Sequence, residues 1–371
     1  MRLSPSDEAF THQVALPHAM VGSSDPSWRE RYWISAQDTT GDAVLTCGFG
    51  QYPNQDVQEA FAVFSSSGSQ WNLRLSRELR PDREHLRTGP FSIEVVRPFE
   101  ELHMVLDDNE SGLAFDLTWE SQLDPILEER HFQYDRARVT YDAIRYVQLG
   151  RVQGVLSSPA GEITVHPETW WSERDHSWGT RPLPHQDSAP PLDRPAWSFL
   201  MFCPIQFEDF SAHVYLFEDD DGAPVHVSAG LAARRGGTGT WPRVVDVEHD
   251  LVWDRSASVL TLASGTLTFV LAGGQRLSFE MTARPGRAHL RGGGYNGWNG
   301  WYQGHWKGEN SLEHDHWDLT DQSVLYRYAS ASSDHLIEVV HEDQRGYGVI
   351  EYVVRGSHRR YGVSVPPRRP R

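Results

Sequence analysis

Short apolar runs separated by turn-forming residues recur along this chain. The segment 70–79 shows the pattern clearly, because its apolar and polar residues alternate with the period of two that a half-buried strand requires. Gly, Asp, Asn and Ser lie between the runs, as at 66–69 and 107–112. No long segment has the 3.6-residue apolar period of a helix, and only 125–145, where Pro125 could open one, is a candidate for a short helix. The sequence therefore predicts an all-β protein.

The predicted strands are 43–50, 58–64, 70–79, 91–97, 102–107 and 113–120 in the first half, and 198–204, 212–218, 225–231, 244–253, 258–263, 266–272, 275–283, 322–330, 335–342 and 346–354 in the second.

A proline-rich segment divides the chain into two halves of similar strand content. The five prolines between 182 and 195 exclude a central strand there. At 371 residues the chain exceeds the size at which one hydrophobic core stops growing. Closing antiparallel strands into a barrel removes their exposed edges. We therefore expect an N-terminal barrel over 1–181, a linker over 182–197 and a C-terminal barrel over 198–371, packed together.

The charge balance limits the partners. The chain carries 34 basic and 51 acidic side chains, a net charge of −17, which argues against nucleic acid and anionic membrane surfaces. No apolar run approaches the roughly 18 residues of a transmembrane helix, and residues 1–13 lack the apolar centre of a signal peptide. Two cysteines, Cys47 and Cys203, cannot build a disulfide scaffold. We expect a cytoplasmic protein without stable membrane insertion; the oligomeric state stays open.

The segment 170–181 is the first candidate site. It holds three tryptophans, two acids, two arginines and a histidine, a mixture that suits neither a dry core nor a free surface. We expect a half-buried site in which Trp171 and Trp178 form an aromatic wall beside a titratable Asp175–His176 pair. The alternative is a structural ion-pair network of that pair with Arg174 and Arg181.

A second aromatic concentration lies at 292–308, where glycines alternate with Tyr295, Trp298, Trp301, Tyr302 and Trp306. Glycines allow close backbone approach and the aromatic rings supply flat apolar area. Two interpretations stay open: a flap over an apolar ligand, or a glycine-bent barrel strand whose rings fill the lumen.

Two further groups could carry chemistry. His314 and His316 form a His-x-His pair that could bind a metal on one strand face, although a polar loop is the simpler interpretation. Glu351 follows Tyr347 inside an otherwise apolar strand. Its carboxylate is either paired with an arginine such as Arg345 or poised in a cavity with a raised pKa.

Four segments carry a resemblance to a known family. The segments 145–154 and 174–181, with 304–308 and 346–351, resemble the actinobacterial branch of the carotenoid 1,2-hydratase / AttH-like superfamily over roughly residues 40 to 363. The resemblance implies a pair of lipocalin-like barrels with the ligand site near their junction. It also implies cofactor-free acid/base chemistry on isoprenoid-like or terpene-like molecules, most typically hydration of an alkene by a lyase of the hydratase type. His176 and Trp178 match the family's His-x-Trp element, whereas its downstream Tyr-x-Asp has no clear counterpart.

Alkene hydration needs a carboxylic acid held neutral, aromatic faces for the cation, and a base for water. We assign Asp175 as the proton donor and His176 as its orienting partner or the water-side base. Trp171, Trp178 and Trp301 would stabilise the cation, and Glu351 or Tyr347 would complete the site. The predicted substrate-binding residues are Trp171, Trp178, Tyr295, Trp301, Trp306 and Tyr347.

Two other classes remain open. A non-catalytic lipocalin-like carrier would need aromatic walls and no acid, and an isomerase or cyclase could use the same scaffold. The sequence has no Gly-x-Ser-x-Gly elbow, no phosphate-binding loop and no GxGxxG opening a helix, so we expect no nucleotide or other cofactor.

Overall fold

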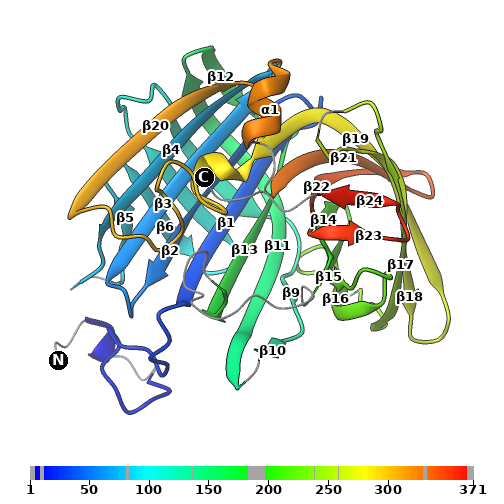
Figure 1. Ribbon diagram of the computed structural model, residues 1–371, viewed down its shortest axis with the longest axis horizontal. Helices are drawn as coiled ribbons and strands as arrows, with labels where there is room; N and C mark the ends of the chain where they lie inside the picture. The colour runs from blue at the N-terminus through cyan, green and yellow to red at the C-terminus, as the bar shows by residue number, and fades with distance from the viewer. Residues whose placement is uncertain are drawn as a thin grey trace.

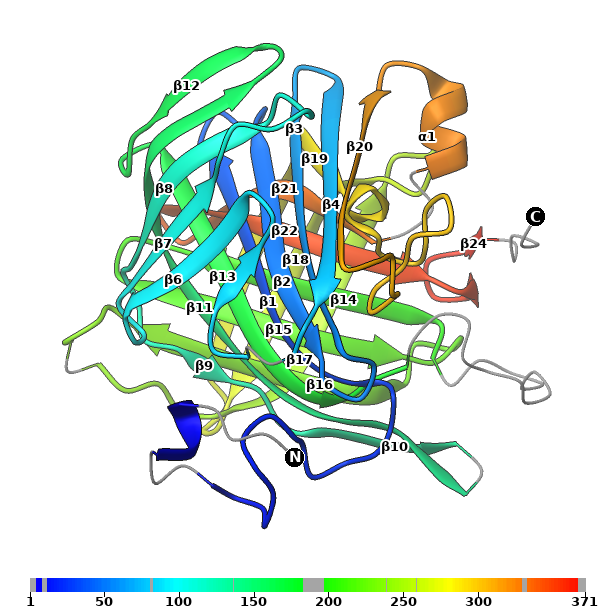
Figure 2. The same cartoon turned by 90° about the vertical axis from the view of Figure 1, so that its left-hand side faces the viewer.

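A computed structural model describes residues 5–8, 12–80, 83–135, 137–182, 197–237, 239–257, 259–328 and 332–365. It shows two nearly closed antiparallel barrels packed side by side (Figure 1), which confirms the predicted all-β class and double-barrel architecture. In Figure 2 the strands of the second barrel run across those of the first. No helix in the described part of the chain is long and apolar enough to cross a membrane.

The first sheet forms one barrel in the order β20-β4-β3-β2-β1-β13-β11-β8-β7-β6-β5, and β9, β10 and β12 also pair with β11. Its strands are β1 (Trp28–Asp38), β2 (Val44–Tyr52), β3 (Val57–Ser66), β4 (Ser69–Glu78), β5 (Leu86–Thr88), β6 (Phe91–Arg97), β7 (Glu101–Leu106), β8 (Ala114–Ser121), β9 (Ile126–Leu127), β10 (His131–Asp135), β11 (Arg138–Ser158), β12 (Gly161–Val165), β13 (Trp170–Thr180) and β20 (Asn310–Asp318).

The second sheet forms the other barrel in the order β16-β15-β14-β22-β21-β19-β18-β17. Its strands are β14 (Phe199–Gln206), β15 (Phe210–Glu218), β16 (Pro224–Ala233), β17 (Val244–Trp253), β18 (Leu262–Leu271), β19 (Arg276–His289), β21 (Ser333–His341) and β22 (Gln344–Val354), and a hairpin of β23 (Gly356–His358) and β24 (Val363–Val365) follows. Short helical turns occur at η1 (Pro5–Glu8), η2 (Leu290–Gly293) and α1 (Gln322–Tyr328).

Burial patterns show where the barrels meet. Along β7 buried and half-buried residues alternate, as expected of a strand with one face toward a barrel interior. Along β2 and β15 every residue is buried, so both faces of these strands are covered. One face lines a barrel interior and the other lies in a third apolar cluster that takes residues from both barrels, among them Trp33, Phe61, Phe202, Tyr215 and Val349. We call this cluster, with the polar groups inside it, the junction layer.

Three sequence predictions of secondary structure are wrong. The candidate helix at 125–145 is instead β9, β10 and the start of β11, because 131–135 and 138–143 pair as a hairpin. Where a strand was predicted at 322–330, residues 322–328 form the helix α1. Its first turn is capped by the Asp321 carboxylate, which accepts the Ser323 N–H at 2.7 Å. The predicted strand at 258–263 is largely a loop, since β18 begins at Leu262.

The division of the chain at 182–197 stays a prediction, because 183–196 lie outside the described residues. One strand from the second half, β20, pairs with β4 of the first barrel. The two halves of the sequence therefore share the first sheet.

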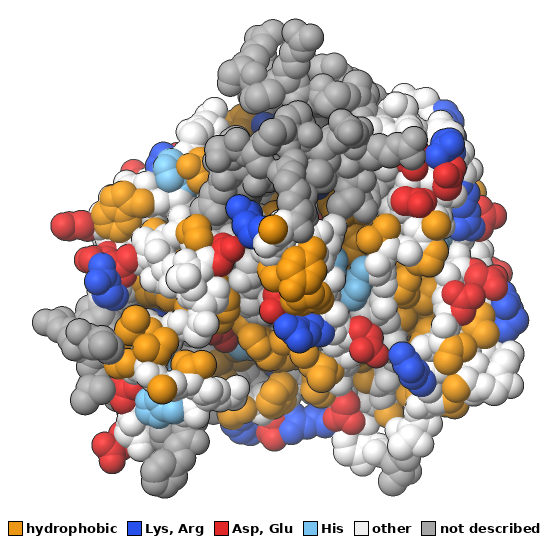
Figure 3. All heavy atoms as spheres, turned by 60° about the horizontal axis from the view of Figure 1, so that its bottom comes forward, with side chains coloured by type: hydrophobic (Ala, Val, Ile, Leu, Met, Phe, Trp, Pro, Cys, Tyr) orange, Lys and Arg blue, Asp and Glu red, His pale blue; other side chains and the backbone are white. Residues whose placement is uncertain are grey.

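The surface mixes charges of both signs with apolar side chains. On the face at the bottom of Figure 1, hydrophobic side chains lie between acidic and basic ones (Figure 3). The strands β9 and β10 contribute exposed Leu127, Phe132 and Tyr134.

Candidate functional site

The strand β13 carries the predicted Asp175–His176 pair, and it places the two side chains on opposite faces. Successive side chains of a strand alternate between the faces of its sheet. His176 lies on the same face as Trp170, which packs in the interior core of the first barrel. Asp175 lies on the other face, across the strand pair from Trp33 in the junction layer. The predicted dyad is therefore wrong as a pair.

Asp175 belongs to an ionic chain inside the junction layer. Its carboxylate Oδ2 is 3.4 Å from Nε of Arg145. Arg145 lies on the neighbouring β11, two residues before Val147, which is the cross-strand partner of Asp175. Arg145 is also 3.6 Å from the Glu128 carboxylate, which in turn bonds Nε2 of His213 at 2.8 Å. The Arg145 guanidinium lies 4.5 Å from the centre of the Tyr215 ring and 5.0 Å from that of Phe202. The first barrel thus holds one cation between two carboxylates, and side chains of the second barrel surround it.

The pKa values of the two carboxylates beside Arg145 are shifted in opposite directions. Burial raises the pKa of Asp175 above its ordinary value, although Arg145 and Arg181 oppose the shift. Burial would also raise the pKa of Glu128, but Arg145 and the hydrogen bond from His213 bring it below its ordinary value. Glu128 is therefore the fixed counter-ion of Arg145, and Asp175 is the titratable partner.

Glu351 faces Asp175 from the second barrel. It lies on β22 opposite Phe202 of β14, so its side chain points into the junction layer, where it is half-buried. Burial raises its pKa, and the charge of Asp175 adds to the shift, while a hydrogen bond from Ser332 opposes it. Of the two predicted interpretations of Glu351, the structure gives the desolvated carboxyl group, because Arg345 pairs instead with Glu338 at 3.3 Å.

Two further carboxyl groups in the layer are completely buried. Asp334 of β21 accepts hydrogen bonds from the Trp33 indole at 3.1 Å and the Thr46 hydroxyl at 2.6 Å. Glu173 of β13 accepts one from the Gln37 amide at 3.1 Å. Each has a second oxygen with no hydrogen-bond partner. Burial raises both pKa values well above the ordinary range, with the charge of Glu351 adding to the shift of Asp334. Burial therefore favours the neutral form of both.

Aromatic side chains border this group from both barrels. Trp171 and Tyr347 meet edge to face across the junction, with ring centres 4.9 Å apart. The other face of Trp171 carries the Arg151 guanidinium at 3.4 Å. The Tyr295 hydroxyl lies 3.4 Å from the Arg31 guanidinium, and its ring packs edge-on against Phe61. The structure thus brings Trp171, Tyr295, Tyr347, Asp175 and Glu351 into one layer.

The glycine-rich segment that carries Tyr295 packs on the outside of the first barrel. It forms η2 and irregular turns, so the interpretation as a lumen-filling strand is wrong. A Cβ atom on Gly292 would lie 1.8 Å from the Asn72 side chain, which explains the need for glycine at this contact. The Gly304 N–H donates to Glu59 at 2.7 Å, and Glu59 also pairs with Arg31. Trp301 is buried and packs near Lys307, whereas Trp306 is exposed.

His176 and Trp178 lie away from the junction layer, on the interior face of the first barrel. The Nε2 atom of His176 is 2.8 Å from the Glu30 carboxylate and its Nδ1 is 3.3 Å from the Tyr146 hydroxyl. The Trp178 ring lies 5.4 Å from the imidazole. These two residues form a separate polar cluster with Tyr32, whose ring is 4.4 Å from that of His176.

His314 and His316 are exposed on β20, a strand rather than the expected polar loop. Asp315 between them bonds Asn72 and Arg74. Within the described part of the chain, no group of three or more His, Cys, Asp or Glu side chains is arranged to hold a metal ion.

Sequence reasoning missed Arg145, Asp334 and Glu173 as members of the site. Arg145 and Glu173 lie inside the segments 145–154 and 170–181, but the face of the strand on which each lies was not considered. The period of two along β13 was the available signal, since it separates Glu173 and Asp175 from Arg174 and His176. Asp334 could not be found this way, because its partners Trp33 and Thr46 lie about 300 positions away in the first barrel.

Two antiparallel barrels in contact, with ionisable groups sealed between them, define a double lipocalin-like protein. The chain belongs to the family described as "Family of unknown function (DUF8625)", which matches residues 3–364. No curated protein matches the chain.

Solved structures share the fold at low sequence identity. A putative AttH from Nitrosomonas europaea is similar with a TM-score of 0.53 and 10% identity, over 88% of this chain and 93% of that one. CghA in complex with Sch210972 has a TM-score of 0.50 and 15% identity, over 89% of each chain. Kievitone hydratase from Nectria haematococca has a TM-score of 0.43 and 11% identity, over 90% and 93%. The likeness to the AttH structure and to CghA with Sch210972 confirms the AttH-like fold; the actinobacterial branch stays a prediction.

Proposed function

We propose that this protein is a cofactor-independent acid/base enzyme that hydrates an alkene of a hydrophobic, isoprenoid-like molecule at the barrel junction. One observation carries the proposal: Glu173, Asp334 and Glu351 come together from both barrels in an apolar layer, where burial raises the pKa of each, and they lie with Asp175, whose upward shift Arg145 and Arg181 oppose. Carboxyl groups that stay protonated at neutral pH are the acids that protonation of an unactivated double bond requires.

Glu351 is the proposed proton donor, in place of Asp175. It is half-buried while Asp334 and Glu173 are fully buried, so among the four acids it combines a raised pKa with access. Its proton adds to one alkene carbon and leaves a cation on the more substituted carbon. The faces of the Tyr295 and Tyr347 rings would stabilise that cation through their quadrupoles.

Asp175 is the proposed base. The contact with Arg145 at 3.4 Å favours its ionised form at the moment when it must accept a proton from water. The oxygen of that water bonds to the cation, and the net change is the addition of one water molecule across the double bond. Proton exchange with solvent then restores protonated Glu351 and ionised Asp175.

The test is incubation of the protein with trisubstituted isoprenoid alkenes in heavy-oxygen water, with products followed by mass spectrometry. We expect one labelled oxygen in each product. Glu351→Gln and Asp175→Asn should each lower the rate by roughly 10²–10⁴-fold, the range found for general acids and bases. Glu280→Gln, an exposed change on β19, is the matched control and should keep full activity.

Three outcomes would contradict the proposal. Full turnover by folded Glu351→Gln and Asp175→Asn proteins would remove both residues from the mechanism. A rearranged product without label would indicate an isomerase or cyclase. A hydrophobic ligand recovered chemically unchanged, with no turnover of any alkene, would indicate a carrier.

A further inference from the structure

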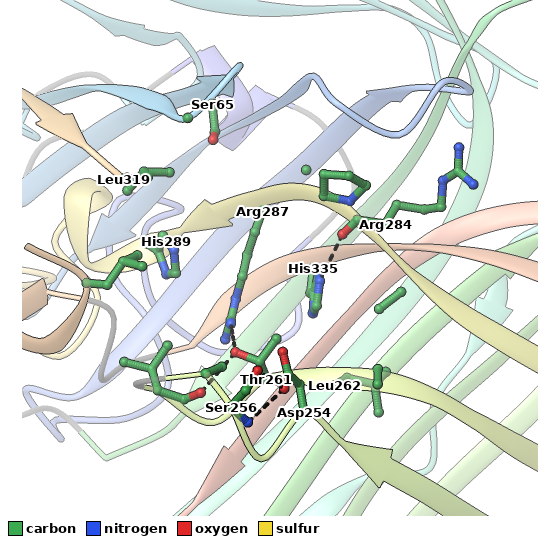
Figure 4. A pocket seen from close by; sticks show the side chains of 18 of the residues that line it. Ser65, Asp254, Ser256, Thr261, Leu262, Arg284, Arg287, His289, Leu319 and His335 are labelled. Carbon is green, nitrogen blue, oxygen red and sulfur yellow. Dashed lines mark hydrogen bonds between the residues drawn. The ribbon is translucent and has the colours of Figure 1, made fainter. Parts of the chain in front are cut away.

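A second concave site lies outside the junction layer. A pocket of about 940 Å³ opens where the β17–β18 connection and strands β19 and β21 of the second barrel meet turns of the first barrel (Figure 4). Ser65 and Asp42 border it from the first barrel, and Leu319 and Leu325 border it beside α1. Its far wall is formed by Thr261 and its neighbours.

Arg287 is the central cation of this pocket. It projects from β19 toward Thr261 in Figure 4. Its guanidinium donates to the hydroxyls of Ser333 at 2.7 Å and Thr261 at 3.3 Å and to the Leu260 carbonyl at 3.3 Å. Within the described part of the chain, no carboxylate forms an ion pair with Arg287. Arg255, which also lines the pocket, donates only to the carbonyls of Tyr361 and Gly362. A half-buried guanidinium whose hydrogen bonds go to neutral acceptors is open to an ion pair with an anionic ligand.

The two carboxylates that border the pocket accept hydrogen bonds from turn residues. Asp254 accepts the N–H of Ser256 at 2.8 Å and its hydroxyl at 2.6 Å. Asp42 accepts the hydroxyl of Ser66 at 3.0 Å and the N–H of Ser67 at 3.1 Å. Neither contacts Arg287, so the charge at the centre of the pocket is positive in a protein whose net charge is −17.

Two histidines flank Arg287 on the same face of β19 and β21. His335 is its cross-strand neighbour and His289 lies two residues further along β19. His289 is 3% exposed, and its Nδ1 has no hydrogen-bond partner. Burial lowers the pKa of His289 well below its ordinary value, and burial with nearby Arg287 lowers that of His335 to about 3. Neutral histidines can donate to an anion without competing for it.

The remaining walls are apolar. Trp253, Leu262, Ala283 and Leu319 line the pocket, and Trp253 and Leu262 belong to the core of the second barrel. If the oxyanion of a ligand binds Arg287, the apolar part of that ligand would therefore pack against these side chains. We propose that this pocket binds an amphiphile with a carboxylate or phosphate head group on an apolar chain, with Arg287 as the head-group ligand and His289 as a second donor.

The proposal is tested by isothermal titration calorimetry with decanoate, decyl phosphate and the neutral decanol. Both anions should bind one per chain, at least roughly tenfold more tightly than decanol, because a charge-assisted hydrogen bond discriminates by about that factor. If only one anion binds, the head group is assigned to that class. Decanol binding as tightly as both anions would overturn the proposal.

Arg287→Gln should weaken binding of the anion at least roughly tenfold and leave decanol unchanged, whereas Arg287→Lys should retain part of the affinity. Arg276→Gln, an exposed arginine on the same strand that pairs with Glu248, is the control and should bind as the unmodified protein does. Because Arg287 also holds the Thr261 loop, Ala263→Glu provides an independent test. Ala263 is an exposed lining residue, and a carboxylate there should repel the anion with little effect on folding.

Undiminished anion affinity in folded Arg287→Gln and Ala263→Glu proteins would overturn the proposal. The result does not depend on the proposed hydration chemistry. Asp334, whose side chain serves the junction layer, and His335, which faces this pocket, are adjacent on β21 and lie on opposite faces. Glu351→Gln should therefore slow hydration by the factor given above and leave the binding of decanoate unchanged.

Discussion

Buried carboxylates occur in two regions of this protein in opposite electrostatic states. Inside the second barrel, the two oxygens of Glu218 lie 2.8 Å from Nε2 of His249 and 3.0 Å from Nε2 of His358. Burial alone would raise the pKa of Glu218, but the hydrogen bonds from the two histidines bring it to about 2. In the junction layer, Asp334 and Glu173 each have one oxygen without a partner, and burial raises their pKa values.

The difference shows that burial alone does not separate a structural carboxylate from a functional one. Glu218 is saturated with donors and ties β15 to β17 and to the β23–β24 hairpin, so it serves the architecture. The acids of the junction layer have too few donors to be stable as anions, and they hold protons instead. The supply of hydrogen bonds to each carboxylate therefore distinguishes the two regions.

The largest expected effect is on stability, from Glu218→Gln. The change removes the charge and one acceptor from between His249 and His358, and breaking a buried ion-pair network by removing one partner costs roughly 3–5 kcal/mol. Urea unfolding at pH 7 would measure the loss. A change in the free energy of unfolding too small to detect would mean that the two regions do not differ in the way described.

The pH dependence of the stability of the same variant tests the direction of the pKa shift of Glu218. The folded-state pKa of Glu218 is depressed from 4.5 to about 2, so the stability that it contributes is present above pH 4.5 and is lost as the pH falls toward 2. The unmodified protein should therefore lose stability more steeply than Glu218→Gln between pH 4.5 and 2. Parallel curves of unfolding free energy against pH would contradict the assignment.

Asp334→Asn should change the free energy of unfolding less than Glu218→Gln does, and in the opposite direction. Its pKa is raised in the folded state, so its contribution is fully present below the unfolded pKa and is lost as the pH rises through the folded pKa. The amide keeps an acceptor for Trp33 and Thr46 but cannot ionise. We expect a gain of about 1–3 kcal/mol at pH 8, the cost of an unpaired buried polar group, and little change at pH 4. A loss of stability at pH 8 would show that the Asp334 anion has partners in the folded protein.

The fold could be predicted from the sequence because alternation such as that of 70–79 is local, and β4 forms there as expected. The helix α1 was read as a strand because Val324, Leu325 and Tyr326 are apolar or aromatic, whereas the Asp321 cap decides the structure. The hairpin of β10 and β11 was missed because Pro125 favoured the start of a helix, although residues 131–135 alternate between polar and apolar types.

The site was predictable only in part. Asp175, Glu351, Trp171, Tyr295 and Tyr347 stood out as charged or aromatic residues in unusual surroundings, and they do meet in the junction layer. Their meeting depends on how two barrels pack, which no local pattern encodes. Asp175 and His176 are consecutive residues of one strand, so their side chains lie on opposite faces. The predicted pair did not take this alternation into account.

The smallest expected effect comes from Glu248→Gln, the same substitution beside His249. Glu248 lies on the outer face of β17, where it pairs with Arg276 and half of its side chain is exposed. Solvent screens such a pair, so unfolding of this variant should match that of the unmodified protein within the error of the measurement. The variant separates two explanations of a loss in Glu218→Gln. If Glu248→Gln lost as much stability, the cause would be the removal of a negative charge from the second barrel. If it lost none, the cause would be the buried contacts of Glu218 with His249 and His358.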